Sequence, residues 1–275
     1  MSKLQIIKDP NNEIVMPIGN LESGEMVGLA PEDRIGNMLI MGKTGQGKSV
    51  EVGVILLSNI LQGRGGLFID PHGDIVDNVL KHMPENIISK TAVFDLGEGS
   101  LEENIKRFED EIHLEEMKKD DKKFLLIRLH TFDLKTDVPL EFGQHLLKQF
   151  YEIVGNQNRS VIIDEAQNFL TKATIENVLD TKSNNSFCVL VGQSTKIYTK
   201  EILDKMLQST DHVISYKADE VTAETLINGL SLDAELGDIT DLEQYTFIGR
   251  FTVNGELTEN IIAKGVFPIP YPEVK

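Results

Sequence analysis

The segment Gly42–Ser49, which reads Gly-Lys-Thr-Gly-Gln-Gly-Lys-Ser, constrains this 275-residue chain more than any other feature. It follows an apolar run and precedes a helical pattern, as a phosphate-binding loop does. Its glycines let backbone N–H groups surround phosphate oxygens, while Lys48 contacts the β- and γ-phosphates and the Ser49 hydroxyl contacts Mg²⁺. The sequence therefore predicts that ATP and magnesium are bound by Gly42, Lys43, Thr44, Gly45, Gln46, Gly47, Lys48, Ser49 and Val50.

Short apolar runs alternate with helical patterns from Ile35 onward, which predicts an α/β fold with a mainly parallel sheet flanked by helices. The runs are mostly continuous, which is typical of strands buried on both faces. The expected strands are Asn37–Met41, Gly66–Ile69, Thr91–Phe94, Phe124–Leu129, Val161–Ile163, Cys188–Val191 and His212–Tyr216. The expected helices are Lys48–Leu61, a helix from the capping box at Ser100 to about Lys118, and Leu140–Val154.

The two ends of the chain differ from this central pattern. Residues 1–34 are expected to form a small N-terminal segment, with a strand or two, that packs on the core. Near the other end, Asn254-Gly255 separates Tyr245–Val253 from Glu256–Lys264, a pattern that predicts a C-terminal β-hairpin with a type I′ turn. The tail Phe267–Pro272 is expected to be extended.

Two acidic residues, Asp164 and Glu165, follow the apolar run Val161–Ile163. At the carboxyl edge of a parallel sheet both would lie beside the phosphate-binding loop. We expect Asp164 to hold the magnesium through water and Glu165 to polarise the attacking water. A surface acid pair that opens a helix is the alternative, and the glycine-rich loop upstream favours the catalytic interpretation.

Two further polar segments follow apolar strands and are expected at the same edge. The segment Asp70-Pro71-His72-Gly73-Asp74 predicts a turn, with Asp70 and His72 facing the nucleotide. Gln193 follows another strand and could sense the γ-phosphate or the lytic water, although a glutamine that satisfies a loop backbone would look the same.

The order of these four segments resembles the FtsK/HerA superfamily of DNA-pumping ATPases. The Asp-Pro-His-Gly-Asp segment is most similar to the TraG/TraD-type conjugative coupling proteins and the HerA-like branch. The resemblance runs from about Val27 to the end of the chain. It implies a RecA-like P-loop NTPase domain over residues 35–275, a hexameric ring, a basic residue from the neighbouring subunit that completes hydrolysis, and duplex DNA in the pore.

The sequence departs from that family in three places. We expect no N-terminal membrane anchor, and the interval 96–123 holds little more than one helix where coupling proteins carry an inserted helical domain. The segment 180–185 before the glutamine strand has no arginine, and we expect no arginine of the same subunit near the γ-phosphate. The charge supplied in trans would then come from Lys182, Arg159 or Arg250, although Arg250 could equally be a solvated strand residue.

The net charge of -17 argues against DNA coating the outer surface, since nucleic-acid-binding proteins usually carry a basic patch. A ring could still grip DNA phosphates in its lumen through lysines in loops at the catalytic edge, for which we expect Lys172, Lys196 and Lys200. No apolar run is long enough to span a membrane, and a single cysteine fits a reducing cytoplasm, so a cytoplasmic location is expected.

The predicted function is that of an ATP-hydrolysing DNA translocase, in conjugative DNA transfer or viral genome packaging, recruited to a membrane or capsid by a protein partner. A second hypothesis is an ATP-gated assembly protein that acts on a protein partner, such as a subunit of a defence complex, without pumping DNA; the acidic charge favours it. A small-molecule kinase is a weaker third hypothesis, because such an enzyme should lack the Asp164-Glu165 pair.

Overall fold

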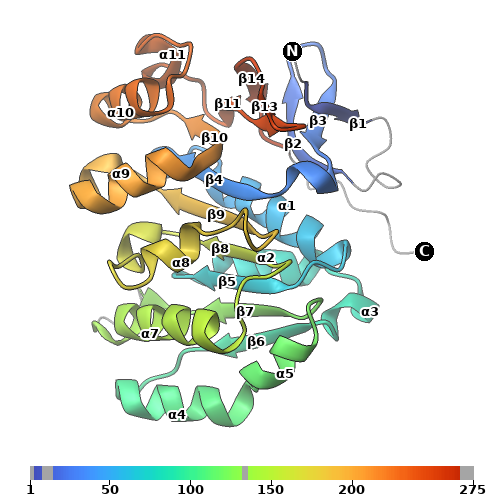
Figure 1. The fold of residues 1–275 in the computed structure, drawn as a ribbon, viewed down its shortest axis with the longest axis vertical. Helices are drawn as coiled ribbons and strands as arrows, with labels where there is room; N and C mark the ends of the chain where they lie inside the picture. The colour runs from blue at the N-terminus through green and yellow to red at the C-terminus, as the bar shows by residue number, and fades with distance from the viewer. Residues whose placement is uncertain (1–2, 8–14, 132–135, 267–275) are drawn as a thin grey trace.

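The computed structural model describes residues 3–7, 15–131 and 136–266, which share one large β-sheet (Figure 1). The strands of this sheet are β1 (Gln5–Ile7), β2 (Met16–Leu21), β3 (Met26–Leu29), β4 (Gly36–Met41), β5 (Gly66–Asp70), β6 (Thr91–Asp95), β7 (Phe124–Arg128), β8 (Ser160–Ile163), β9 (Phe187–Gly192), β10 (Thr210–Tyr216), β11 (Thr246–Arg250) and β14 (Ile261–Lys264). A separate small ribbon consists of β12 (Thr252–Val253) and β13 (Glu256–Leu257).

Helices connect most of these strands. The α-helices are α1 (Lys48–Leu61), α2 (Asp74–His82), α3 (Glu85–Ile88), α4 (Leu101–Glu111), α5 (Leu114–Lys119), α7 (Val138–Ile153), α8 (Ile175–Leu179), α9 (Lys200–Ser209), α10 (Glu220–Leu230) and α11 (Gly237–Thr240). Short 3₁₀ turns are η1 (Pro31–Asp33), η2 (Ala166–Asn168) and η3 (Thr195–Ile197).

The sheet has a parallel part and an antiparallel part. Its order is β1-β3-β2-β14-β11-β10-β4-β9-β8-β5-β7-β6, and the strands from β10 to β6 all run parallel. The strands from β11 to β1 pair antiparallel with their neighbours. The carboxyl ends of the parallel strands therefore meet along one edge, called the carboxyl edge below, and their starts meet along the opposite amino edge.

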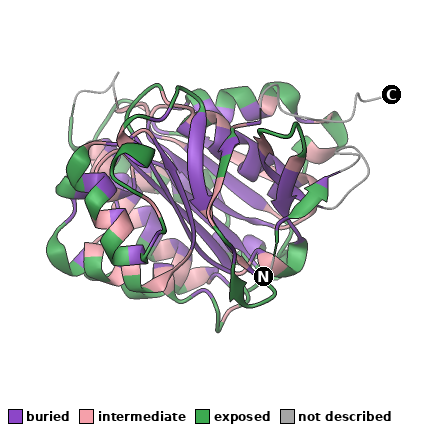
Figure 2. Ribbon diagram, turned by 90° about the horizontal axis from the view of Figure 1, so that it is seen from above, coloured by how far each residue is buried: buried purple, intermediate pink, exposed green. Residues whose placement is uncertain are grey.

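The sheet is covered on both faces, which explains why its central strands are apolar throughout. One apolar cluster joins the sheet to α4, α5, α7, α9 and α10, and a second joins its other face to α1, α2 and the N-terminal strands. Figure 2 shows the buried strands between helices whose outer sides are exposed. The predicted α/β fold is confirmed, and every expected strand is present within one or two residues.

The structure differs from the expected elements in two places. The charged helix after Ser100 opens with the predicted capping box but is broken into α4 and α5. The chain is extended at Ile112, where the break lets Ile112, Leu114 and Met117 all enter the core. The C-terminal hairpin pairs β11 with β14, and its tip forms the separate ribbon around Asn254-Gly255.

The N-terminal strands do more than pack on the core. They continue the sheet through β2, which pairs with the hairpin strand β14.

Asn254 and Gly255 both have positive φ angles, as a type I′ turn requires. The predicted extended tail, Phe267–Pro272, lies outside the described residues.

Candidate nucleotide-binding site

The loop between β4 and α1 has the shape that phosphate binding requires. Gly42, Gly45 and Gly47 have φ angles of 151°, 77° and 122°, which side chains disfavour. A Cβ on Gly42 would lie 2.7 Å from the Cβ of Tyr216, so β10 leaves no space for a side chain there. No side chain caps the N-terminus of α1, and its first N–H groups remain available to an anion.

Lys48 lies inside this loop. Its Nζ donates to the carbonyl oxygens of Gly42 at 2.6 Å and Lys43 at 3.1 Å, and the residue is 8% exposed. Burial lowers the pKa of Lys48, while Glu165 and Asp164 raise it. The ammonium group therefore lies between the loop and the two acids. Around it, the side chains of Lys43, Thr44 and Ser49 are exposed.

The acidic pair lies at the end of β8, as predicted. Asp164 is buried, and burial, with the nearby Glu165 and Asp70, raises its pKa to about 7. Glu165 has a φ angle of 48°, an unusual value that turns the chain sharply after the strand. Gln193 donates its side-chain N–H to Glu165 at 2.6 Å, and Gln167 donates to the other carboxylate oxygen.

The two glutamines fix the carboxylate of Glu165 through their amide N–H groups. A fixed carboxylate at the mouth of a phosphate loop is suited to orient a water molecule for attack. Gln193 comes from the end of β9, between β4 and β8. The sequence pattern identified Gln193 but missed Gln167, since a glutamine in the motif Asp-Glu-Ala-Gln could equally face solvent.

Asp70 has a different role from the predicted one. Its carboxylate is fully buried and accepts four backbone N–H bonds of 2.9–3.1 Å, from His72, Gly73, Ile75 and Val76. These bonds occupy both oxygens, so nothing in the contacts of Asp70 supports direct nucleotide binding. Asp70 instead holds the turn that starts α2, and it adds negative charge behind Asp164.

His72 lies at the carboxyl edge, where it was expected. Its Nδ1 is 3.2 Å from the hydroxyl oxygen of Thr131, which follows β7. Next to it is an arginine that the sequence analysis did not consider. Arg128 ends β7 and forms ion pairs with Asp77 of α2 and Asp95 of β6, both at 2.5 Å.

Arg128 lies at the same edge but four strands from β4 and its phosphate loop, so the expectation that no arginine of the same subunit lies near the γ-phosphate stays a prediction. Arg128 lies opposite Asp70 in the sheet, which puts it on the strand next to β5 and two strands from Asp164. The hydrogen bonds and charges of Asp95 and Asp77 raise the pKa of Arg128 against the effect of burial. Because both carboxylates hold the guanidinium, its first role is to join β6, β7 and α2.

The three basic residues expected to act in trans lie away from the phosphate loop. Arg159 precedes β8 at the amino edge, is 2% exposed, and donates to the carbonyl oxygens of Met117 and Asp120 at the end of α5. A buried guanidinium in this position cannot reach another subunit. Arg159 is therefore a structural residue.

Lys182 and Arg250 are more accessible. Lys182, also at the amino edge, forms a 2.6 Å ion pair with Asp211, and its side chain is 73% exposed. Arg250 donates to the carbonyl oxygens of Leu230 and Ser231, which end α10. Both remain candidates for a contact with a neighbouring subunit.

Two of the three lysines expected to contact DNA form ion pairs within the chain. Lys172 pairs with Glu201, and Lys196 pairs with Asp219 at 3.0 Å. Lys200, at the start of α9, is exposed. These exposed pairs are weak, because solvent screens them, and DNA phosphates could replace the carboxylates.

The described residues offer neither a membrane-spanning helix nor a cluster of metal-ligating side chains. None of their helices has both the length and the apolar character needed to cross a bilayer. Nor do these residues include a group of three or more His, Cys, Asp or Glu side chains placed to hold a metal. Mg²⁺ that enters with a nucleotide commonly uses one or two protein ligands plus phosphate oxygens and water, and Ser49 and Asp164 fit that requirement.

Comparisons with known proteins agree on the fold. No protein-family profile and no curated protein sequence matches the chain. VirB4 of Thermoanaerobacter pseudethanolicus has a similar structure, with a TM-score of 0.64, 12% identity, and coverage of 95% of this chain and 98% of that chain.

Two further solved structures are similar. The plasmid coupling protein TrwB, in complex with an ATP analogue, gives a TM-score of 0.65 at 12% identity, over 98% of this chain and 96% of that chain. The genome packaging NTPase B204 of Sulfolobus turreted icosahedral virus 2, in complex with AMPPCP, gives a TM-score of 0.51 at 16% identity. The match covers 85% of this chain and 99% of that chain. The chain therefore shares the RecA-like fold of these neighbours, a mainly parallel sheet flanked by helices.

Proposed function

We propose that this protein is a ring-forming ATPase that uses hydrolysis to move DNA. The observation that carries the proposal is the arrangement of Lys48, Glu165 and Gln193 at one edge of the sheet. The phosphate loop binds the triphosphate through its backbone N–H groups, and Lys48 exchanges its carbonyl contacts for the β- and γ-phosphates. Glu165 then orients and deprotonates the water that attacks the γ-phosphate in line.

Ser49 and Asp164 are the residues that would hold Mg²⁺ with the nucleotide. The ion would neutralise charge on the phosphates as the bond to the leaving group breaks. Asp164 is poised for this because its carboxylate is buried beside Glu165 and Asp70, where a cation relieves the repulsion. Gln193 contacts Glu165 directly and so can transmit the presence of a γ-phosphate to β9.

Hydrolysis is expected to need a neighbouring subunit. Lys182 and Arg250 lie far from the phosphate loop of their own subunit, so either would act on the nucleotide of the next subunit in a head-to-tail ring. We favour Lys182 because its side chain is mostly exposed. Mixing Glu165→Gln subunits with Lys182→Ala subunits should restore part of the activity, because some mixed interfaces combine an intact Glu165 with an intact Lys182.

The DNA-moving role rests on the shared fold and on the similarity to proteins described as a coupling protein and a genome packaging NTPase. Conjugative transfer and genome packaging both remain uses of such a motor, with a protein partner recruiting the ring to a membrane or capsid. Duplex DNA would pass through the pore and contact Lys172, Lys196 and Lys200 through its phosphates.

The test is ATP turnover by the assembled protein with and without duplex DNA. We expect DNA to stimulate turnover at low salt, and the stimulation to fall steeply with salt, as binding to phosphates does. Lys172→Glu and Lys196→Glu should remove the stimulation and leave basal turnover unchanged. Assembled rings that neither bind DNA nor respond to it at low salt would contradict the motor, and would favour the ATP-gated assembly protein.

A further inference from the structure

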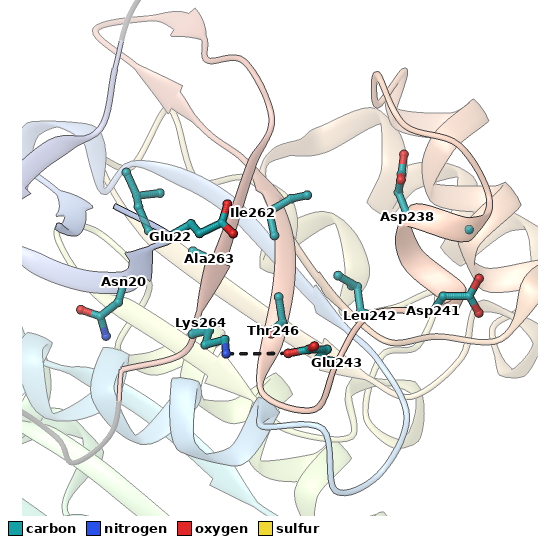
Figure 3. Close-up of a pocket in the computed structure, with 12 residues that line it drawn as sticks. Asn20, Glu22, Asp238, Asp241, Leu242, Glu243, Thr246, Ile262, Ala263 and Lys264 are labelled. Carbon is teal, nitrogen blue, oxygen red and sulfur yellow. Dashed lines mark ion pairs between the residues drawn. The ribbon is translucent and has the colours of Figure 1, made fainter. Parts of the chain in front are cut away.

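Two cavities meet at Lys264, close to the phosphate loop. The larger, of about 800 Å³, lies over β14, β11 and the turn at α11, and Figure 3 shows Lys264 and Glu243 pointing toward each other on its wall. Its other charged groups are the acids Glu22, Asp238 and Asp241. This acidic groove would repel a triphosphate.

The smaller cavity, of about 300 Å³, has a different lining. Gly47 and Val50 come from the phosphate loop and the first turn of α1, and Tyr216, Tyr245 and Gly265 supply the remaining apolar wall. Among the described residues that line it, Lys264 carries the one charged side chain, and it pairs with Glu243 at 3.7 Å. An apolar cavity that begins at the phosphate loop lies where the rest of a bound nucleotide must go.

Tyr245 is held rigidly against the loop although it is 53% exposed. Its backbone N–H donates to the carbonyl oxygen of Gln46 at 3.0 Å, and its own carbonyl accepts from Gly265 at 2.9 Å. The φ angle of Tyr245 is 64°, a costly value for a residue with a large side chain. The fold therefore maintains an exposed aromatic ring at the mouth of the cavity.

Tyr216 forms the floor of the cavity and is held from below. Its hydroxyl donates to the Oε2 atom of Glu51 at 3.4 Å, and Glu51 is 1% exposed with no partner for its Oε1 atom. A Cβ on Gly265 would lie 3.2 Å from the Tyr216 hydroxyl oxygen. A larger residue at 265 would thus narrow the cavity from the side opposite the phosphate loop.

We propose that this cavity holds the base of the bound nucleoside triphosphate, that Tyr245 stacks on it, and that adenine and guanine are accepted about equally. The proposal rests on the proposed ATPase function and extends it to base recognition. Stacking on an aromatic ring tolerates any base. The Lys264 ammonium, which lines the cavity, is only a donor, so it would favour an acceptor such as N7, which both purines share.

The experiment measures the dissociation constants of the full-length protein for MgATP, MgGTP and magnesium tripolyphosphate, which lacks the base. In Tyr245→Ala we expect about five- to one-hundred-fold weaker binding of both nucleotides, with tripolyphosphate changed by less than about two-fold. Tyr245→Phe should keep wild-type affinities. Ile262→Ala removes another exposed apolar side chain of the same hairpin and serves as the matched control.

A second variant guards against misfolding of Tyr245→Ala. Gly265→Val should narrow the cavity and weaken the binding of both nucleotides, again without an effect on the binding of tripolyphosphate. The proposal is overturned if both variants bind ATP as the wild type does, if tripolyphosphate binding falls equally, or if the wild type prefers ATP over GTP by more than about ten-fold, which would require recognition of the base edge.

The design separates this proposal from the ATPase motor. If Lys48→Ala abolishes nucleotide binding while Tyr245→Ala and Gly265→Val have no effect, the base cavity is wrong and the phosphate site stands. If Tyr245→Ala gives the expected pattern but DNA fails to affect turnover, the cavity stands and the motor is wrong.

Discussion

The two edges of the parallel sheet carry similar residue types and use them differently. At the carboxyl edge, the Lys48 ammonium and the Glu165 carboxylate converge on an exposed loop. At the amino edge, Arg159 caps the end of α5, and the Lys182–Asp211 pair anchors the start of β4 through a bond from Asn37. Charged groups beside the phosphate loop are directed at a ligand. Those at the amino edge, like Asp70 and Arg128 farther along the carboxyl edge, hold loops and strands together.

Strand direction explains this difference. Loops at the carboxyl edge follow buried strands and precede helices, so their N–H groups and helix starts face outward with a positive potential. At the amino edge, helix ends present carbonyl oxygens instead, and the basic Arg159 and Arg250 satisfy them. The same residue type thus serves binding beside the phosphate loop and stability elsewhere in the fold.

The largest effect should follow from removing the lysine of the carboxyl edge. Lys48→Ala should abolish ATP binding and with it turnover, because no other side chain supplies a buried cation inside the loop. Lys122→Ala, in a loop at the amino edge, is the matched control and should bind ATP normally. Equilibrium binding of a fluorescent ATP analogue measures both. Normal binding by Lys48→Ala would remove the distinction between the edges.

Removing the arginine of the amino edge should affect stability instead. In Arg159→Met the buried carbonyl oxygen of Met117 and the partly buried one of Asp120 lose their donor, which should lower the free energy of unfolding by about 1–3 kcal/mol. Urea denaturation measures this change. At urea concentrations too low to unfold the protein, the Michaelis constant of Arg159→Met for ATP should equal that of the wild type. A large rise in that constant with unchanged stability would place Arg159 in the active site.

A pH-dependent effect is expected for the buried acid under the carboxyl edge. Burial raises the pKa of Glu51 from 4.5 to about 8. The folded chain therefore binds a proton at Glu51 more tightly than the unfolded chain does. The contribution of this proton to the free energy of unfolding falls as pH rises from 4.5 through 8. Glu51→Gln has no proton to lose at this position, so its melting temperature should rise relative to that of the wild type as pH increases over this range. Parallel melting curves from pH 5 to 8 would contradict the buried, protonated acid.

The sequence was sufficient to place the phosphate loop, the strands and the acidic pair in the fold, because each position depends on local patterns that few other structures tolerate. It was insufficient where a role depends on contacts between distant segments. Asp70 looked like a ligand because the four N–H groups that donate to its carboxylate come together only when the turn closes. Arg128 was overlooked because its two partners lie 51 and 33 residues away.

The tyrosines of the small cavity were missed for the same reason. Tyr216 ends a strand and Tyr245 starts a hairpin, and neither position signals a binding role until the fold brings both to Gly47. The break between α4 and α5 likewise depends on packing, since Ile112 and Leu114 enter the core together only if the helix stops. Tertiary contacts decide such cases against the local pattern.

The central claim is that Glu165 activates the water that cleaves ATP, and single-turnover hydrolysis by Glu165→Gln tests it most directly. The amide keeps the shape of the side chain and can still contact Gln193, but it cannot accept the proton. We predict that the variant binds ATP with wild-type affinity and cleaves it about 100- to 10,000-fold more slowly. Cleavage at a rate near that of the wild type, with ATP bound, would contradict the account.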